Sequence, residues 1–90
     1  MNKIRMFPFA SYIDAALRLA EYERDEDEIV IAQVPNMQGF YAQGDTFEEA
    51  RENLRDVIEG HLVLALQLGW PIPAIEGVII EEQDAETIAA

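Results

Sequence analysis

Acidic side chains are the groups in this chain whose types and spacing come nearest to a catalytic pattern. Glu21 and Glu23 fall in an alternating, extended pattern, whereas Glu48, Glu49 and Asp56 fall in a helical one. Carboxylates that converge on one point can hold Mg²⁺ and cleave RNA, as they do in two-metal nucleases. Nothing in the spacing of these five acids brings them together. We therefore predict no catalytic residue, no metal and no cofactor, and keep a metal-dependent nuclease as an alternative.

The other groups able to do chemistry have simpler explanations. The acidic run from Asp25 to Glu28 offers oxygen ligands to a hard cation, but it lacks the ligand spacing and central glycine of an EF-hand loop. His61, the only histidine, falls between Ile58 and Ala65 on an apolar stripe, where we expect a core or interface residue instead of a general base. The chain has no cysteine, which excludes disulfides, thiolate metal ligands and cysteine nucleophiles.

The charge of the chain limits its partners. Its 90 residues hold 18 acids and 6 bases, a formal net charge of −12, and no Lys or Arg follows Arg55. Proteins that bind nucleic acids draw affinity from Lys and Arg side chains that neutralise phosphates, so we expect no binding to DNA, RNA or anionic membranes. An acidic surface instead attracts a basic protein and speeds its association. The alternative is that the acids serve only solubility.

Four strands and a short helix are predicted around these acids. Ser11 followed by Asp14 has the form of a capping box and predicts a short N-terminal helix from about Tyr12 to Leu19. Alternating and β-branched segments bounded by turn residues then predict strands over residues 20–24, 29–34, 40–43 and 78–80. The first three strands form an antiparallel meander. Its middle strand is apolar on both faces, and we expect both faces to be covered.

A long helix is the clearest element. The passage Asp45-Thr46-Phe47-Glu48-Glu49 contains two overlapping capping boxes, Asp45 with Glu48 and Thr46 with Glu49. Gly69 suits the position after a helix, and a proline follows, so the helix is expected to run from Phe47 to Leu68. Spacings of three and four give one apolar face, made of Phe47, Ala50, Leu54, Val57, Ile58, His61, Ala65 and Leu68.

The second half of this helix is apolar around most of its circumference, so one small sheet cannot cover it. Either the segment from Trp70 to Ile75 folds back over it, or a second subunit covers it. We predict a homo-oligomer, a dimer or a tetramer, because short domains gain burial by self-association. The residues predicted to contact another copy or a partner are Gly60, Leu62, Val63, Leu64, Leu66, Trp70 and Ile72. The acids predicted to contact a basic partner are Glu21, Glu23, Asp25 and Asp27.

One domain accounts for the chain, residues 1–90, with an ordered core over 11–80 and a flexible acidic tail over 81–90. The fold class is α+β: a three-stranded antiparallel meander and a fourth short strand, packed on one long α-helix, with a short N-terminal helix. The N-terminal residues lack the pattern of a signal peptide, and no apolar run approaches the length of a membrane span. These features predict a cytoplasmic protein.

The order of the elements and one passage resemble the HicB antitoxins. The passage is Gly-Phe-Tyr-Ala-Gln-Gly-Asp-Thr-Phe-Glu-Glu-Ala, residues 39–50, with Pro35 before it, and the long helix closes on Gly-Trp-Pro-Ile-Pro, residues 69–73. The resemblance implies a partial ribonuclease H-like sheet with one long helix packed on it. It also implies a protein that binds and inhibits HicA, a small basic RNA-cleaving toxin.

The resemblance leaves three functions to compare. Many HicB proteins carry a C-terminal DNA-binding domain, but only residues 81–90 follow the last predicted strand here. The resemblance therefore implies a short form without direct DNA binding. A vestigial ribonuclease H-like, metal-dependent nuclease and a stand-alone oligomeric scaffold are the alternatives to an antitoxin.

Overall fold

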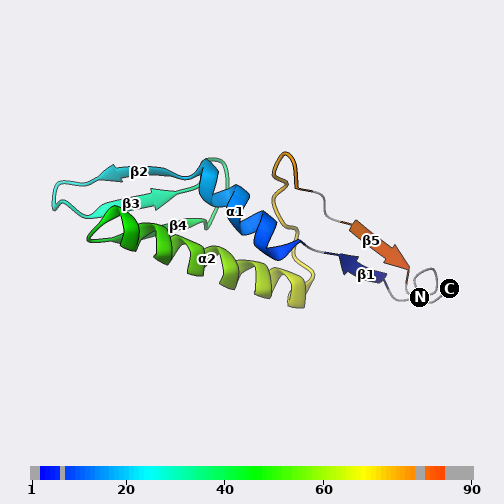
Figure 1. Cartoon of the computed structure of the whole chain (residues 1–90). Coiled ribbons are helices and arrows are strands. Elements are labelled where there is room, and N and C mark those ends of the chain that lie inside the picture. Colours follow the sequence, from blue (N-terminus) through cyan, green and yellow to red (C-terminus); the bar gives the residue numbers. More distant parts are fainter. Residues whose placement is uncertain (1–2, 7, 79–80, 85–90) are drawn as a thin grey trace.

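The computed structural model describes residues 3–6, 8–78 and 81–84. It is an α+β fold, as predicted, and Figure 1 shows the order and arrangement of its elements. The elements are β1 (Lys3–Met6), α1 (Phe9–Leu19), β2 (Glu21–Arg24), β3 (Val30–Gln33), β4 (Tyr41–Gly44), α2 (Phe47–Leu68) and β5 (Glu81–Asp84).

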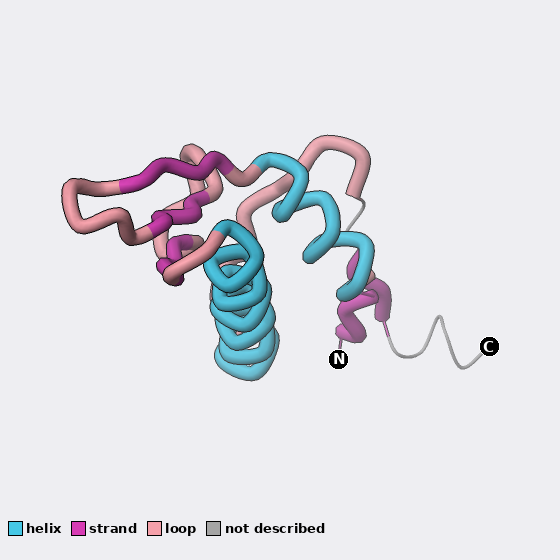
Figure 2. Tube along the Cα trace, turned by 60° about the vertical axis from the view of Figure 1, so that its left-hand side comes forward, coloured by secondary structure: helices cyan, strands magenta, loops and turns pink. Residues whose placement is uncertain are grey.

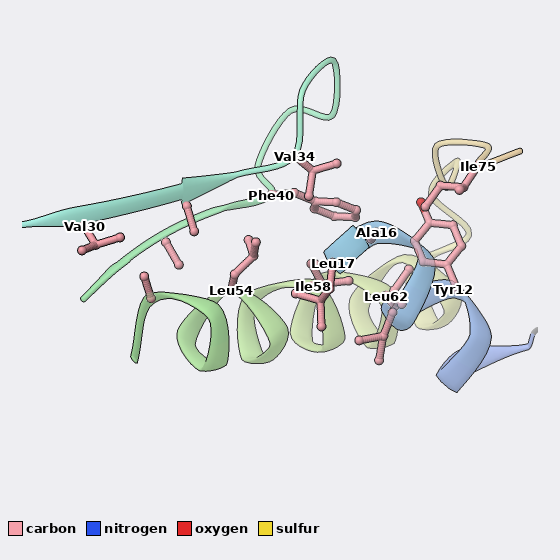
Figure 3. Close-up of a cluster of buried hydrophobic side chains, with 14 residues drawn as sticks. Tyr12, Ala16, Leu17, Val30, Val34, Phe40, Leu54, Ile58, Leu62 and Ile75 are labelled. Atoms are coloured by element: carbon pink, nitrogen blue, oxygen red, sulfur yellow. The ribbon is translucent and has the colours of Figure 1, made fainter. Parts of the chain in front are cut away.

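Strands β2, β3 and β4 form the predicted antiparallel meander, with β3 in the centre. The register places Tyr22 opposite Ala32 and Ala32 opposite Ala42. Helix α2 packs under β3 and β4, and α1 packs against α2 beside the sheet (Figure 2). Side chains from both helices and from one face of the sheet meet in the core (Figure 3).

The prediction that β3 is covered on both faces is wrong. Val30 and Ala32 are fully buried under α2, but Ile31 is only half-buried and Gln33 is exposed. Successive residues of a strand point to opposite faces of the sheet. Since α2 covers only one of those faces, the described part of the chain leaves the second face of the meander open.

The ends of α2 agree with the sequence prediction at both residues. The Thr46 hydroxyl accepts a hydrogen bond of 3.0 Å from the backbone N–H of Glu49, and the Glu49 carboxylate accepts one of 3.4 Å from the N–H of Asp45. Asp45 is therefore tied to Glu49 and not to Glu48, the predicted partner. At the other end Gly69 adopts a φ of 72° and donates its N–H to the carbonyl of Ala65. This left-handed conformation favours glycine and ends the helix.

The start of α1 differs from the prediction. The helix begins at Phe9 instead of Tyr12, and Ser11 lies inside the first turn instead of capping it. The carbonyl of Pro8 accepts the first helical hydrogen bond, from the N–H of Tyr12 at 2.9 Å. The earlier start lets Phe9 pack against the core, which a cap at Ser11 would not do.

The predicted fourth strand and the predicted frayed tail also need correction. Val78 is outside any strand and packs against the core, while residues 79–80 fall outside the described residues. Glu81–Asp84, expected to be part of the tail, forms β5 and pairs antiparallel with β1, which was not predicted. Figure 1 shows the β1–β5 ribbon apart from the three-stranded sheet. This pairing joins residues 3–6 to residues 81–84, which are far apart in the sequence. Local sequence patterns therefore could not predict it.

The segment after α2 folds back over the core, one of the two coverings considered above. Ile75 is buried, and Ile72 is half-buried against the same cluster. The Tyr12 hydroxyl, on α1, donates a hydrogen bond to the carbonyl of Pro73 and fixes the segment in place. Burial raises the pKa of Tyr12 to about 12, so its phenol is neutral and able to donate at physiological pH.

Gly44 marks a close approach between the sheet and α2, and it provides a stability test. A Cβ added there would lie 2.6 Å from the backbone nitrogen of Ala50. Gly44→Ala is expected to lower the free energy of unfolding by about 2 kcal/mol, because backbone atoms must move apart. Gly60→Ala is the matched control. An added Cβ meets nothing within 4 Å at Gly60, and alanine is the better helix former, so we expect a gain of about 1 kcal/mol. Urea unfolding of both variants measures the difference, and equal stabilities would contradict the packing at Gly44.

Candidate functional site

The uncovered face of the meander is the first candidate surface, and we name it the open sheet face. Alternation along each strand places two side chains per strand on it, because their neighbours point toward α2. Its six residues are Glu21 and Glu23 of β2, Ile31 and Gln33 of β3, and Tyr41 and Gln43 of β4.

The strand register fixes how these side chains neighbour each other. Glu23 lies opposite Ile31, and Ile31 lies opposite Gln43. In the second row Glu21, Gln33 and Tyr41 are neighbours in the same way. A shallow depression lies over β2 and β3, with the two glutamates and Ile31 among its lining residues. The face is therefore acidic along β2 and carries an aromatic side chain on β4.

Arg24, the only base of β2, points away from the open sheet face. Its guanidinium lies 5.0 Å from the centre of the Phe47 ring, on the α2 side, and donates a hydrogen bond of 3.2 Å to the carbonyl of Glu28. The Phe47 ring also packs at an angle against Tyr22, with 6.1 Å between ring centres. In the sequence, Arg24 is the only base between Arg18 and Arg51. The cation–π contact with Phe47 holds this positive charge on the covered side of the sheet.

The acidic turn between β2 and β3 is built by Asp25. Its carboxylate accepts hydrogen bonds from the N–H groups of Asp27 at 2.9 Å and Ile29 at 3.0 Å. The φ of 63° at Glu28 completes the turn. Asp25 and Asp27, both predicted to contact a partner, are exposed, but the two acids differ in their bonds. Asp25 holds the turn through its carboxylate, whereas Asp27 takes part in the described hydrogen bonds only through its backbone N–H.

The second candidate surface is an apolar row on α2, and we name it the α2 stripe. Val57, His61, Leu64 and Leu68 follow one another at helical spacings of four, three and four, and Trp70 continues the row beyond the helix end. Val57, Leu64, Leu68 and Trp70 are 36%, 47%, 57% and 46% exposed. His61 anchors the row: its ring packs edge-on against Phe40, with 5.2 Å between centres, and lies 6.4 Å from that of Trp70.

The residues predicted to form an interface do not share one surface. Leu62 is fully buried among core side chains, so its placement in a contact surface is wrong. Gly60, Val63, Leu64 and Trp70 are exposed, whereas Leu66 and Ile72 are half-buried. A helix turns by about 100° per residue, so the side chains of a long run of consecutive positions cannot all face one partner. The α2 stripe also contains Val57 and Leu68, which the sequence placed on the core face.

The acids of the nuclease alternative are not brought together. Glu21 and Glu23 lie on the open sheet face, and Glu48 and Glu49 lie in the first turn of α2, beneath the opposite face. Asp56 is exposed on α2. Within residues 3–6, 8–78 and 81–84, no group of three or more acidic, histidine or cysteine side chains is placed to hold a metal ion. None of the helices in the same residues is long and apolar enough to cross a membrane.

A family model described as UPF0150-like matches residues 11–73, from the first turn of α1 to the segment that folds back over the core. The chain belongs to the UPF0150-like family. A curated UPF0150 protein of Synechocystis, ssr1258, is 51% identical over 37 residues, which span 41% of this chain and 54% of that protein. This UPF0150-like chain therefore matches about half the length of that relative.

Two solved structures share the fold of this UPF0150-like protein. The protein TTHA0281 of Thermus thermophilus is 30% identical with a TM-score of 0.74, and the match covers 80% of this chain and 90% of that one. The N-terminal domain of the Burkholderia pseudomallei antitoxin HicB is 20% identical with a TM-score of 0.54, and the match covers 73% and 92%. The similarity confirms the predicted HicB-like fold, a meander packed on one long helix.

Proposed function

We propose that this UPF0150-like protein is an antitoxin that binds and inhibits a small basic RNA-cleaving toxin of the HicA type. The observation that carries the proposal is the shared fold with the N-terminal domain of the HicB antitoxin, in a chain of net charge −12. A toxin that binds RNA needs a basic surface for the phosphates. An acidic protein competes for that surface and blocks it, and no bond needs to be made or broken.

The negative charge of this protein is expected to speed its association with the proposed basic toxin. Complementary charge raises the association rate at low salt, and screening by salt reduces that gain. Affinity then depends on the apolar contacts made once the two proteins meet. Because the toxin acts on RNA, the proposed place of action is the cytoplasm.

Self-association is the second part of the proposal, and the α2 stripe is its surface. From Gly60 to Ile75 the chain contains no acid and no Lys or Arg, although 27% of all its residues are charged. Two copies of a protein with a net charge of −12 repel each other unless they meet where charges are few. The α2 stripe offers such a place, with four half-exposed apolar side chains.

A co-expression experiment tests the antitoxin proposal. The gene next to this one is expected to encode a basic chain with a single central histidine, and that chain is expected to arrest growth when it is produced alone. Co-expression of this protein restores growth, and the two chains co-purify at low salt. A chain that forms oligomers but neither restores growth nor retains the toxin would favour the scaffold alternative. RNA cleavage by this protein that needs Mg²⁺ and is lost in Glu21→Gln would favour the nuclease.

A further inference from the structure

We infer that the open sheet face is the surface on which the basic toxin docks, with Ile31 at its centre, Tyr41 on its β4 edge, and Glu21 and Glu23 on its β2 edge. The inference rests on the proposed antitoxin function and assigns its contact surface. It differs from the sequence prediction, which named Glu21, Glu23, Asp25 and Asp27 as partner contacts but included none of the residues of β3 or β4.

The open sheet face lacks a partner within the described part of the chain. A small antiparallel sheet is often covered on one face and solvated on the other, and α2 covers only the face that carries Val30, Ala32 and Ala42. On the other face Tyr41 is 50% exposed. Tyrosine is enriched at binding hot spots because a rigid ring offers a large contact area and a hydroxyl that bonds at the rim.

Charge decides which kind of partner fits this face. It carries two carboxylates and no base, because Arg24 is held on the other side by the Phe47 ring. The adjoining turn adds the exposed acids Glu26 and Asp27. The local potential is therefore negative without compensation, which repels nucleic acids and attracts Lys and Arg side chains.

The outer surface of α2 has a different charge pattern. Arg51 and Arg55 are interspersed there with acids, and Arg55 lies 3.7 Å from the carboxylate of Asp14 on α1. These bases reduce the attraction for a cationic partner. The α2 stripe contains no acidic side chain and no Lys or Arg. Of these three described surfaces, only the open sheet face combines uncompensated acids with an exposed aromatic ring.

The shape of the face also suits long basic side chains. Ile31 forms an apolar patch between Glu23 on one side and Gln43 on the other, and the shallow depression lies over it. Lys and Arg place their methylene stems on apolar surface and keep their charged ends beside acids or water. A basic partner is therefore expected to insert such side chains along β2 while Tyr41 packs against its backbone or an apolar neighbour.

Two charge-reversal variants with the same change in net charge test the inference. The first, Glu21→Lys with Glu23→Lys, alters the open sheet face, and the second, Glu52→Lys with Glu59→Lys, alters exposed positions of α2. Calorimetry measures the affinity of each variant for the basic chain encoded by the neighbouring gene, made harmless by replacement of its central histidine. The first variant is expected to bind about 100-fold more weakly, and the second no more than about 3-fold more weakly.

Tyr41→Ala, which leaves the charge unchanged, is expected to weaken binding by about 30-fold, since an exposed aromatic anchor is lost. Circular dichroism and urea unfolding verify that all variants remain folded. Equal losses in both charge-reversal variants would mean that net charge alone attracts the toxin, and unchanged affinity in the first would place the contact elsewhere. Either outcome overturns the inference while the antitoxin function stands. Failure of the unaltered protein to bind overturns both.

Discussion

Leu62→Ala is expected to lower the free energy of unfolding by about 3 kcal/mol, a large part of the stability of a domain of this size. Leu62 is fully buried and belongs to the largest side chains of the core, together with Leu54 and Ile58 on the same face of α2. Shortening it leaves a cavity between α2 and the elements above it, and the surrounding core relaxes only in part. Urea unfolding at a fixed protein concentration measures the loss.

Val63→Ala is the matched control for this change. Val63 is the next residue of the same helix and is 41% exposed, so its loss removes little buried surface. We expect a change within about 0.5 kcal/mol, the usual range for surface positions. A Leu62→Ala protein that keeps its stability but loses its oligomeric state would contradict the structure and return Leu62 to the interface, where the sequence had placed it.

The elements that the sequence predicted best are those whose signals are local. The limits of α2 follow from Thr46, Glu49 and Gly69, whose side chains or backbone act within one turn of the helix ends. The meander follows from turn residues between short apolar segments. The β1–β5 ribbon could not be predicted, because it pairs residues from the two ends of the chain and each strand has only four residues.

The errors at the candidate site have a common physical cause. Residues 60–66 of α2 are almost uniformly apolar, so composition identifies the segment but not the side that packs on the core. The burial of Leu62 and the exposure of Leu64 are set by the direction from which α1 and the sheet approach the helix. Arg24 is a related case, because alternation along the strand already separates it from Glu21 and Glu23, but only the structure shows that its guanidinium lies over the Phe47 ring of α2.

The two candidate surfaces lie on different sides of the fold, and this separation has a consequence for the proposed function. The open sheet face is carried by β2, β3 and β4, whereas the α2 stripe lies on the helix that covers their other face. An oligomer formed through the stripe leaves each acidic face free. Under the proposed function, several toxin molecules can then bind one oligomer, and each acidic subunit of the oligomer adds to the negative field that attracts them.

Leu64→Glu is expected to convert the protein to a monomer. The unaltered chain is expected to show a mass above that of one chain in light scattering at micromolar concentration, because we propose that a second copy covers the α2 stripe. Leu64 is the central residue of the stripe and 47% exposed. A carboxylate there would be desolvated against an apolar partner and would add to the repulsion between two acidic chains. The emission of Trp70, the only tryptophan, is expected to shift to the red as its ring becomes solvated.

Val63→Glu introduces the same charge one residue away, at a position with similar exposure, 41%, but about 100° around the helix from Leu64. It is expected to leave the oligomer intact, and this difference separates a contact through the stripe from a general effect of charge on α2. Dissociation by Val63→Glu and not by Leu64→Glu would move the contact to the side of the helix that carries Val63. A monomeric unaltered protein at micromolar concentration would remove the self-association proposal, and the stripe would then be available for the apolar part of toxin binding.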